Sequence, residues 1–131
     1  MYPKVKDPSR VGEYSAVARA GGGYVWDEVL EYRVWFHDEN GDEYYYAFGD
    51  AQTALECFNE EDGAEEPLAL ILQKEYVSEP EPGNYIHVKE ERIAEWPLEF
   101  LRRPRRNENT IPNFMSPNAP ENRLDIIRGL V

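Results

Sequence analysis

Cysteines, long apolar runs and basic residues are all scarce in this 131-residue sequence, and each absence excludes a class of protein. A single cysteine, Cys57, excludes an internal disulfide and is typical of a reducing compartment, so we expect a cytoplasmic protein. No apolar run approaches the ~20 residues of a membrane span, and no hydrophobic segment follows the N-terminal lysines as in a signal peptide. We therefore expect no membrane partner.

Lysine and arginine number 14 against 26 acidic residues, which gives a net charge of −12. The imbalance lies in residues 24–100, which hold 21 acids and four bases, whereas both ends of the chain carry a small basic excess. Because attraction to phosphate requires lysine and arginine, we expect no nucleic-acid ligand. An acidic body favours solubility or a basic partner.

No segment has the spacing of a catalytic, cofactor or metal site. The acidic segment 38–43 lacks the glycine that an EF-hand loop needs at its sixth position. The glycines at 21–23 precede a predicted strand, whereas a phosphate-binding loop follows one. Cys57, His37 and His87 match no zinc spacing and no thiol-catalysis pattern. We therefore expect no cofactor and no metal, and the balance favours a protein that is not an enzyme.

The length and the 13% aromatic content predict one globular domain over residues 1–131. Residues 1–23 are expected to form an irregular arm and residues 24–103 a ββαββ core. Residues 104–131 are expected to form a proline-rich tail that docks on this core and ends in a short helix. The predicted fold class is α+β, with a curved, mainly antiparallel four-stranded sheet and one main helix.

The clearest predicted element is a β-hairpin. Residues 24–37 alternate with a period of two and are rich in aromatic and β-branched side chains, which indicates a strand. Asn40-Gly41 then favours a two-residue type I′ turn, because both residues tolerate positive φ. Residues 44–49 form the predicted return strand.

One helix and two further strands are expected after the hairpin. Asp50 is expected to cap a helix with the apolar stripe Ala51, Ala54, Leu55 and Phe58. Residues 68–77 and 84–90 are the predicted third and fourth strands, joined by a loop. The predicted core is Val34, Phe36, Leu55, Phe58, Leu70, Leu72, Ile86 and Val88.

A two-residue turn would place aromatic side chains on both faces of the hairpin, because it pairs residues whose numbers sum to 81. The face away from the core would then carry Trp35, His37, Tyr44, Tyr46 and Phe48. Monomeric proteins rarely leave such a patch bare. We expect the tail to cover most of it, and any remainder to form a groove for a peptide, a small ligand or a second copy in a homodimer.

The one basic block comprises Arg102, Arg103, Arg105 and Arg106, interrupted by Pro104. Such a block can contact phosphate or an acidic partner. It can also neutralise acidic residues of the same chain. The second interpretation is favoured because the body beside it is strongly acidic.

Three segments of the C-terminal third resemble a group of small uncharacterised bacterial proteins that are sometimes labelled GCN5-related acetyltransferases. They are EWPLEFL at 95–101, TIPNF at 110–114 and NRLDIIRGL at 122–130. The resemblance extends from about residue 2 to the end and implies acetyl-CoA binding. The pyrophosphate turn of the acetyltransferases reads Arg/Gln-x-x-Gly-x-Gly/Ala. Its nearest match starts at Arg19 and ends on Tyr24, so no catalytic or cofactor-binding residue is carried over.

These observations predict a non-enzymatic binding or regulatory module that uses an aromatic sheet face. Two alternatives stay open. One is an unusual acyltransferase that uses acetyl-CoA, as the resemblance implies. The other is an acidic decoy that occupies the basic groove of a nucleic-acid-binding protein.

Overall fold

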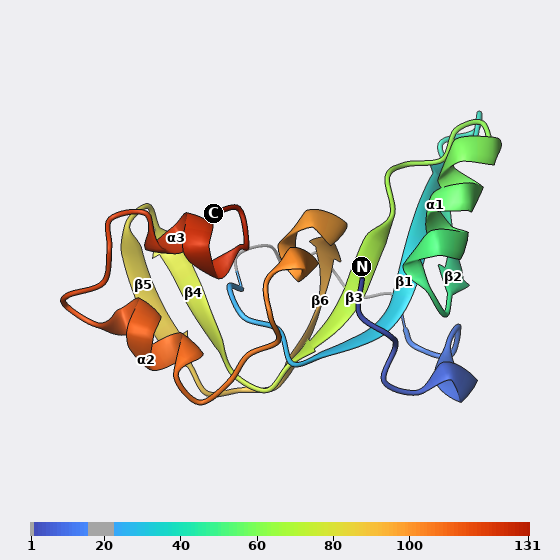
Figure 1. The fold of residues 1–131 in the computed structure, drawn as a ribbon. Helices are drawn as coiled ribbons and strands as arrows, with labels where there is room; N and C mark the ends of the chain where they lie inside the picture. The colour runs from blue at the N-terminus through green and yellow to red at the C-terminus, as the bar shows by residue number, and fades with distance from the viewer. Residues whose placement is uncertain (1, 16–22) are drawn as a thin grey trace.

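The computed structural model describes residues 2–15 and 23–131 and confirms the α+β fold class (Figure 1). A four-stranded antiparallel sheet has the strand order β2-β1-β3-β6, and a second sheet pairs β4 with β5. The strands of the larger sheet are β1 (Glu28–His37), β2 (Glu43–Phe48), β3 (Leu68–Gln73) and β6 (Arg92–Pro97). No helix among the described residues is long and apolar enough to cross a membrane.

Strand β1 organises the larger sheet because it pairs with β2 on one side and β3 on the other. A register shift between Val29 and Glu31 marks a bulge against β3, and bulges bend and twist a strand. The N-terminal arm also reaches β1, where Val5 forms a parallel bridge with Val29. Residues Pro8–Arg10 of this arm form one 3₁₀ turn.

Residues 38–42 connect β1 to β2, and the Asp38 N–H donates to the Asp42 carbonyl at 3.0 Å. The tip of the hairpin therefore has three residues, 39–41, and the predicted two-residue type I′ turn is wrong. Type I′ requires positive φ at both Asn40 and Gly41, and only Gly41 has it, at 83°. The Asp38 carbonyl accepts from the Gly41 N–H, and its carboxylate accepts from the N–H groups of Asn40 and Asp42. The pairing therefore shifts by one residue relative to the prediction.

This shift changes which side chains share a face, because strand side chains alternate with a period of two. Trp35 pairs with Tyr45, and Phe36 pairs with Tyr44. Tyr44, Tyr46 and Phe48 consequently lie on the face of Phe36, and the predicted grouping of these three residues with Trp35 and His37 is wrong. The physical cause is the extra turn residue.

Helix α1 (Ala51–Glu60) follows β2 and packs on the face of the sheet that carries Phe36. Asp50 caps it as predicted, because its carboxylate accepts from the Thr53 N–H at 2.8 Å. The main core beneath the helix contains Val34, Phe36, Ala54, Ile71 and Trp96.

The predicted third strand is two strands, and the predicted fourth belongs to another sheet. After β3 the chain continues into β4 (Tyr76–Glu81), which pairs with β5 (Asn84–Val88). The fourth strand of the larger sheet is β6, for which no strand was predicted. Proline is tolerated at the end of β6 because this strand lies at the sheet edge.

The C-terminal tail docks, although not where the sequence analysis placed it. After a 3₁₀ helix, η2 (Leu98–Arg102), come α2 (Thr110–Met115) and α3 (Arg123–Ile127), which lie beside β4 and β5 (Figure 1). A second core there comprises Tyr24, Val25, Val77, Ile111, Phe114 and Ile127. The prediction that residues 104–131 cover the hairpin is therefore wrong.

The predicted core is correct for the larger sheet and incorrect for β5. Val34, Phe36, Leu70 and Leu72 are buried. Leu55 and Phe58 are half-buried, as is Val88. Ile86 is 47% exposed because β5 presents that side chain to solvent.

Two isoleucines of opposite exposure test this account of the core. Ile71→Ala should lower the free energy of unfolding by about 2–5 kcal/mol, because Ile71 is fully buried in β3. Ile86→Ala is the matched control, and we expect a loss below about 1 kcal/mol at that exposed position. Urea denaturation measures both. Equal losses would contradict the assignment of β5 to a separate, solvent-facing hairpin.

Candidate functional site

An aromatic patch lies on the edge strand β2. The rings of Phe36 and Tyr44 are stacked, with centroids 5.1 Å apart and planes 6° apart, and Tyr46 lies 5.1 Å from Phe36. Tyr44 is 43% exposed and Tyr46 is 51% exposed, whereas Phe48 is half-buried against the main core. Of the predicted aromatic site residues, Tyr44 and Tyr46 therefore form an accessible pair.

The other two predicted residues of the hairpin site are engaged within the chain. The Trp35 indole N–H donates to the Glu95 carboxylate at 2.6 Å. His37 lies between two carboxylates, with Glu43 at 3.5 Å and Glu65 in hydrogen-bond contact. Neither side chain joins the tyrosine pair.

The basic block is dispersed, because its four arginines point to different parts of the molecule. Arg105 pairs with Glu28 at 2.6 Å. Arg106 pairs with Asp27 at 2.8 Å and with Glu75 at 3.0 Å. These two side chains neutralise acidic residues of the same chain, as the favoured interpretation predicts. Arg102 instead borders a hollow beside α1, whose lining also contains Leu55 and Phe58.

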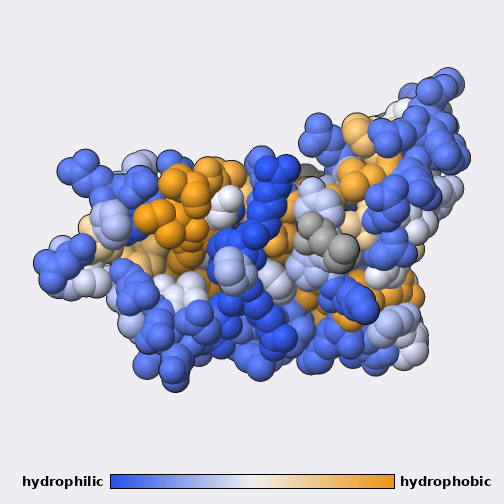
Figure 2. Space-filling view, viewed as in Figure 1, coloured by the Kyte–Doolittle hydropathy of each residue, from blue (hydrophilic) through white to orange (hydrophobic). Residues whose placement is uncertain are grey.

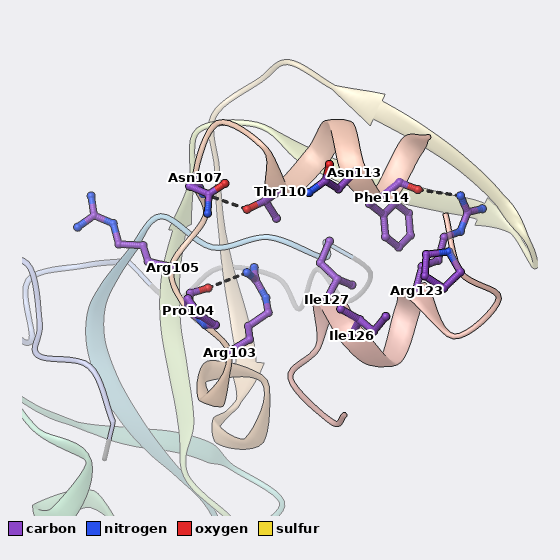
Figure 3. A pocket seen from close by; sticks show the side chains of 11 residues that line it. Arg103, Pro104, Arg105, Asn107, Thr110, Asn113, Phe114, Arg123, Ile126 and Ile127 are labelled. Atoms are coloured by element: carbon purple, nitrogen blue, oxygen red, sulfur yellow. Dashed lines mark hydrogen bonds between the residues drawn. The ribbon is translucent and has the colours of Figure 1, made fainter. Parts of the chain in front are cut away.

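Arg103 is the most deeply placed arginine of the block, with 7% of its surface exposed. Its side chain lies in the wall of a pocket of about 260 Å³ between the 103–107 segment, α2 and α3 (Figure 3). Burial lowers the pKa of its guanidinium to about 10. Arg103 is therefore the arginine of the block whose side chain is buried in a cavity wall.

The opposite face of the hairpin holds a buried ionic network that the sequence analysis missed. Arg33 is fully buried, and its Nε donates to the Glu31 carboxylate at 2.7 Å. Its Nη1 lies 3.8 Å from the Glu95 carboxylate, and its guanidinium stacks on the Tyr45 ring at 4.1 Å. Glu31 and Arg33 are two residues apart on one strand. That spacing on an otherwise apolar strand was the only available signal.

The N-terminal arm closes this network. The Gly12 N–H donates to Glu31 at 2.9 Å. The carbonyls of Tyr14 and Ser15 accept from Arg33 at 3.3 and 3.2 Å. Buried charges need such pairing and hydrogen bonding. The network therefore fixes the arm to the sheet and has a structural role.

Thiol and metal chemistry gain no support from the described parts of the chain. Burial raises the pKa of the Cys57 thiol, with smaller contributions from Glu61 and Glu60, and a raised pKa disfavours the reactive thiolate. His87 contacts Glu75 at 3.2 Å in the β4–β5 region, and no contact joins it to Cys57. Residues 2–15 and 23–131 contain no cluster of three or more metal-binding side chains.

The substitution Arg33→Met tests whether the buried ionic network stabilises the fold. The substitution leaves two buried carboxylates without their cation, so the free energy of unfolding should fall by about 3–5 kcal/mol at pH 7. The loss should be smaller at pH 5, because unpaired buried carboxylates bind protons more readily in the folded state than in the unfolded state.

Arg10→Met is the control, since Arg10 and Glu13 form an exposed pair at 3.9 Å. We expect a change below about 1 kcal/mol with no pH dependence. Urea titrations at both pH values provide the measurement. An Arg33→Met loss that is the same at pH 5 and pH 7 would contradict the network.

The resemblance to bacterial proteins labelled acetyltransferases stays a prediction. The nearest match to their pyrophosphate turn begins at Arg19, which lies outside the described residues. In the described part, Gly23 precedes β1 and no helix follows it. The chain matches no protein-family model, no curated protein and no solved structure.

Proposed function

We propose that this protein is a non-enzymatic binding module that docks a basic, extended segment of another protein on strand β2. The observation that carries the proposal is the pair of accessible tyrosines, Tyr44 and Tyr46, on the edge strand. Edge strands recognise extended segments by adding them as a further strand, and alternate side chains supply specificity. Tyr44 and Tyr46 are such alternate positions.

The geometry of β2 supports this mode of binding. β2 pairs with β1 on one side, and no described strand pairs with its other side. Edges of this kind are usually blunted by lysine, proline or a bulge. β2 has the sequence EYYYAF, which contains neither lysine nor proline, and its pairing with β1 is regular.

Charge selects the chemistry of the partner. Residues 38–66, which include the hairpin tip, β2 and α1, hold eleven acids and no lysine or arginine. A lysine or arginine of a bound strand would meet these carboxylates and the faces of Tyr44 and Tyr46, and cation–π contacts add attraction. A second copy would bring the same negative charge, so the homodimer is disfavoured relative to a basic partner.

The remaining expectations follow from this proposal. The acidic-decoy alternative relies on the same acidic surface, but its partner is a basic groove, which does not need the edge of β2. The cytoplasmic location stays a prediction. The acetyl-CoA alternative has no supporting geometry in the described residues and is the weaker candidate.

The test uses a synthetic peptide with alternating lysine and valine and a matched peptide with alternating glutamate and valine. Fluorescence anisotropy at low and high salt measures binding. The lysine peptide should bind, and its affinity should fall with salt because the carboxylates are exposed. Replacing Tyr44 and Tyr46 together by serine should weaken binding about tenfold, since two exposed cation–π contacts contribute about 0.5–1 kcal/mol each.

Ile86→Ser is the matched control, because Ile86 is also about half exposed but lies on β5. It should leave the peptide affinity unchanged. Amide chemical shifts should move along β2 on binding. Equal binding of both peptides, or an unchanged affinity in the double tyrosine variant, would refute the proposal.

A further inference from the structure

The pocket beside α3 is distinct from β2. The helices α2 and α3, which help to line it, lie at the end of the molecule away from β2 (Figure 1). Three parts of the chain line it: the 103–107 segment, α2 and α3. Figure 3 shows the Ile127 side chain between those of Arg103 and Phe114. An exposed apolar surface adjoins the pocket over α3 and the C-terminus, where Figure 2 shows orange. The residues exposed there are Ile126, Leu130 and Val131.

Arg103 carries a buried charge that no described carboxylate pairs with. Its Nη1 donates to the Pro104 carbonyl at 2.8 Å, and its Nη2 donates to the Tyr24 carbonyl at 3.3 Å. Its Nε is buried and has no hydrogen-bond partner among the described atoms. Both bonds of this guanidinium therefore go to neutral carbonyl groups.

Asp27 is the acid that acts electrostatically on Arg103, but its own oxygens are already used. One accepts from Arg106 at 2.8 Å, and the other accepts from the Lys74 N–H at 2.7 Å. Burying a charge without a paired counter-charge is costly. The lowered pKa of Arg103 reflects the same burial. An anion in the pocket would offset this cost.

The other two arginines of the lining are already engaged. The Arg105 side chain points away from the pocket and pairs with Glu28. Arg123 donates to the Phe114 carbonyl at 2.8 Å, and its guanidinium lies over the Tyr85 ring at 4.6 Å. One available guanidinium matches a single negative charge better than a polyphosphate, which usually needs several cations.

The rest of the lining indicates the body of the ligand. Phe114 and Ile127 are buried apolar side chains, and Ile126 is 46% exposed at the same pocket. Asn107 and Asn113 add amide groups that can hydrogen-bond to polar ligand atoms. A volume near 260 Å³ lies slightly below the usual range of about 300–1,000 Å³ for drug-sized ligands. The ligand is therefore small.

We propose that this pocket binds a small organic acid, with its carboxylate at Arg103 and its apolar body against Phe114, Ile126 and Ile127. Binding is reversible and involves no chemical step. The site is independent of the peptide surface on β2, since the two share no residue.

The experiment compares benzoate and hexanoate with their neutral amides, benzamide and hexanamide, as probes of the full chain. Calorimetry and amide chemical shifts measure binding. The acids should bind at least about tenfold more tightly than the amides, as expected for one charge-assisted contact. Shifts should concentrate in residues 103–127. No binding by either acid, or equal affinity for acid and amide, would overturn the proposal.

Variants locate the two parts of the ligand. Arg103→Met keeps the apolar stem and removes the charge, so the preference for acid over amide should disappear. Arg105→Gln is its control and should leave that preference unchanged. A preference that survives in Arg103→Met would overturn the role of Arg103.

A second pair of variants keeps the test valid if Arg103→Met fails to fold. Ile126→Trp fills the pocket from a half-exposed position and should abolish binding of both acids. Ile86→Trp makes the same change at a position of similar exposure on β5 and should have no effect. Undiminished binding in Ile126→Trp would place the probes elsewhere and overturn the proposal.

Discussion

The guanidinium of Arg33 holds together parts of the chain that are far apart in sequence. It contacts Glu31 on its own strand, Glu95 on β6 and Tyr45 on β2, and it donates to the arm at Tyr14. These contacts replace the water that a buried charge loses. Replacing Arg33 by an uncharged residue would leave the Glu31 and Glu95 carboxylates buried without their cation. The arm and the two outer strands of the larger sheet therefore meet at this one side chain.

The two sheets and the helices packed on them carry different sets of charged side chains. In the larger sheet and α1, residues 38–66 hold eleven acids and no lysine or arginine. The β4–β5 hairpin with α2 and α3 forms a second layer with four arginines. Arg105 and Arg106 pair with acids, Arg123 lies over the Tyr85 ring, and Arg103 donates to backbone carbonyls. A protein with a net charge of −12 thus places four of its 14 basic residues in this second layer. The two proposed sites would take ligands of opposite charge.

Local patterns predicted the elements that depend on neighbouring residues. The alternation in β1 and the Asp50 cap of α1 each arise within a few positions, and both were recognised. The turn at Gly41 was not, because Asn-Gly fits two turn types. The Asp38 carboxylate decides between them through hydrogen bonds to backbone N–H groups, which residue spacing does not reveal. Because the predicted pairing was wrong by one residue, it assigned each side chain of β2 to the opposite face of the hairpin.

Features that join distant segments were beyond sequence reasoning. β6 was missed because a charged residue, Glu95, stands between Ala94 and Trp96, and the partners of its carboxylate, Trp35 and Arg33, lie some sixty residues away. The apolar run at 68–72 and the apolar pair Tyr76-Val77 were read as one strand, and nothing in the pattern showed that β3 and β4 enter different sheets. The Arg103 pocket likewise needs three segments of the tail to meet. The sequence analysis identified the basic block. It could not predict where each arginine lies, because that depends on contacts with residues far away in the sequence.

The outer edge of β2, with which no described strand pairs, also affects how readily copies of the protein aggregate. An unprotected edge strand rich in tyrosine is a template on which like chains stack into fibrillar assemblies. Here the dense carboxylates around it act as an electrostatic barrier between copies, which takes the place of the lysine or proline that usually blocks such an edge. The barrier exists only while those carboxylates carry their charge, and salt screens it because they are exposed. Conditions that neutralise or screen this charge therefore remove the protection of the strand.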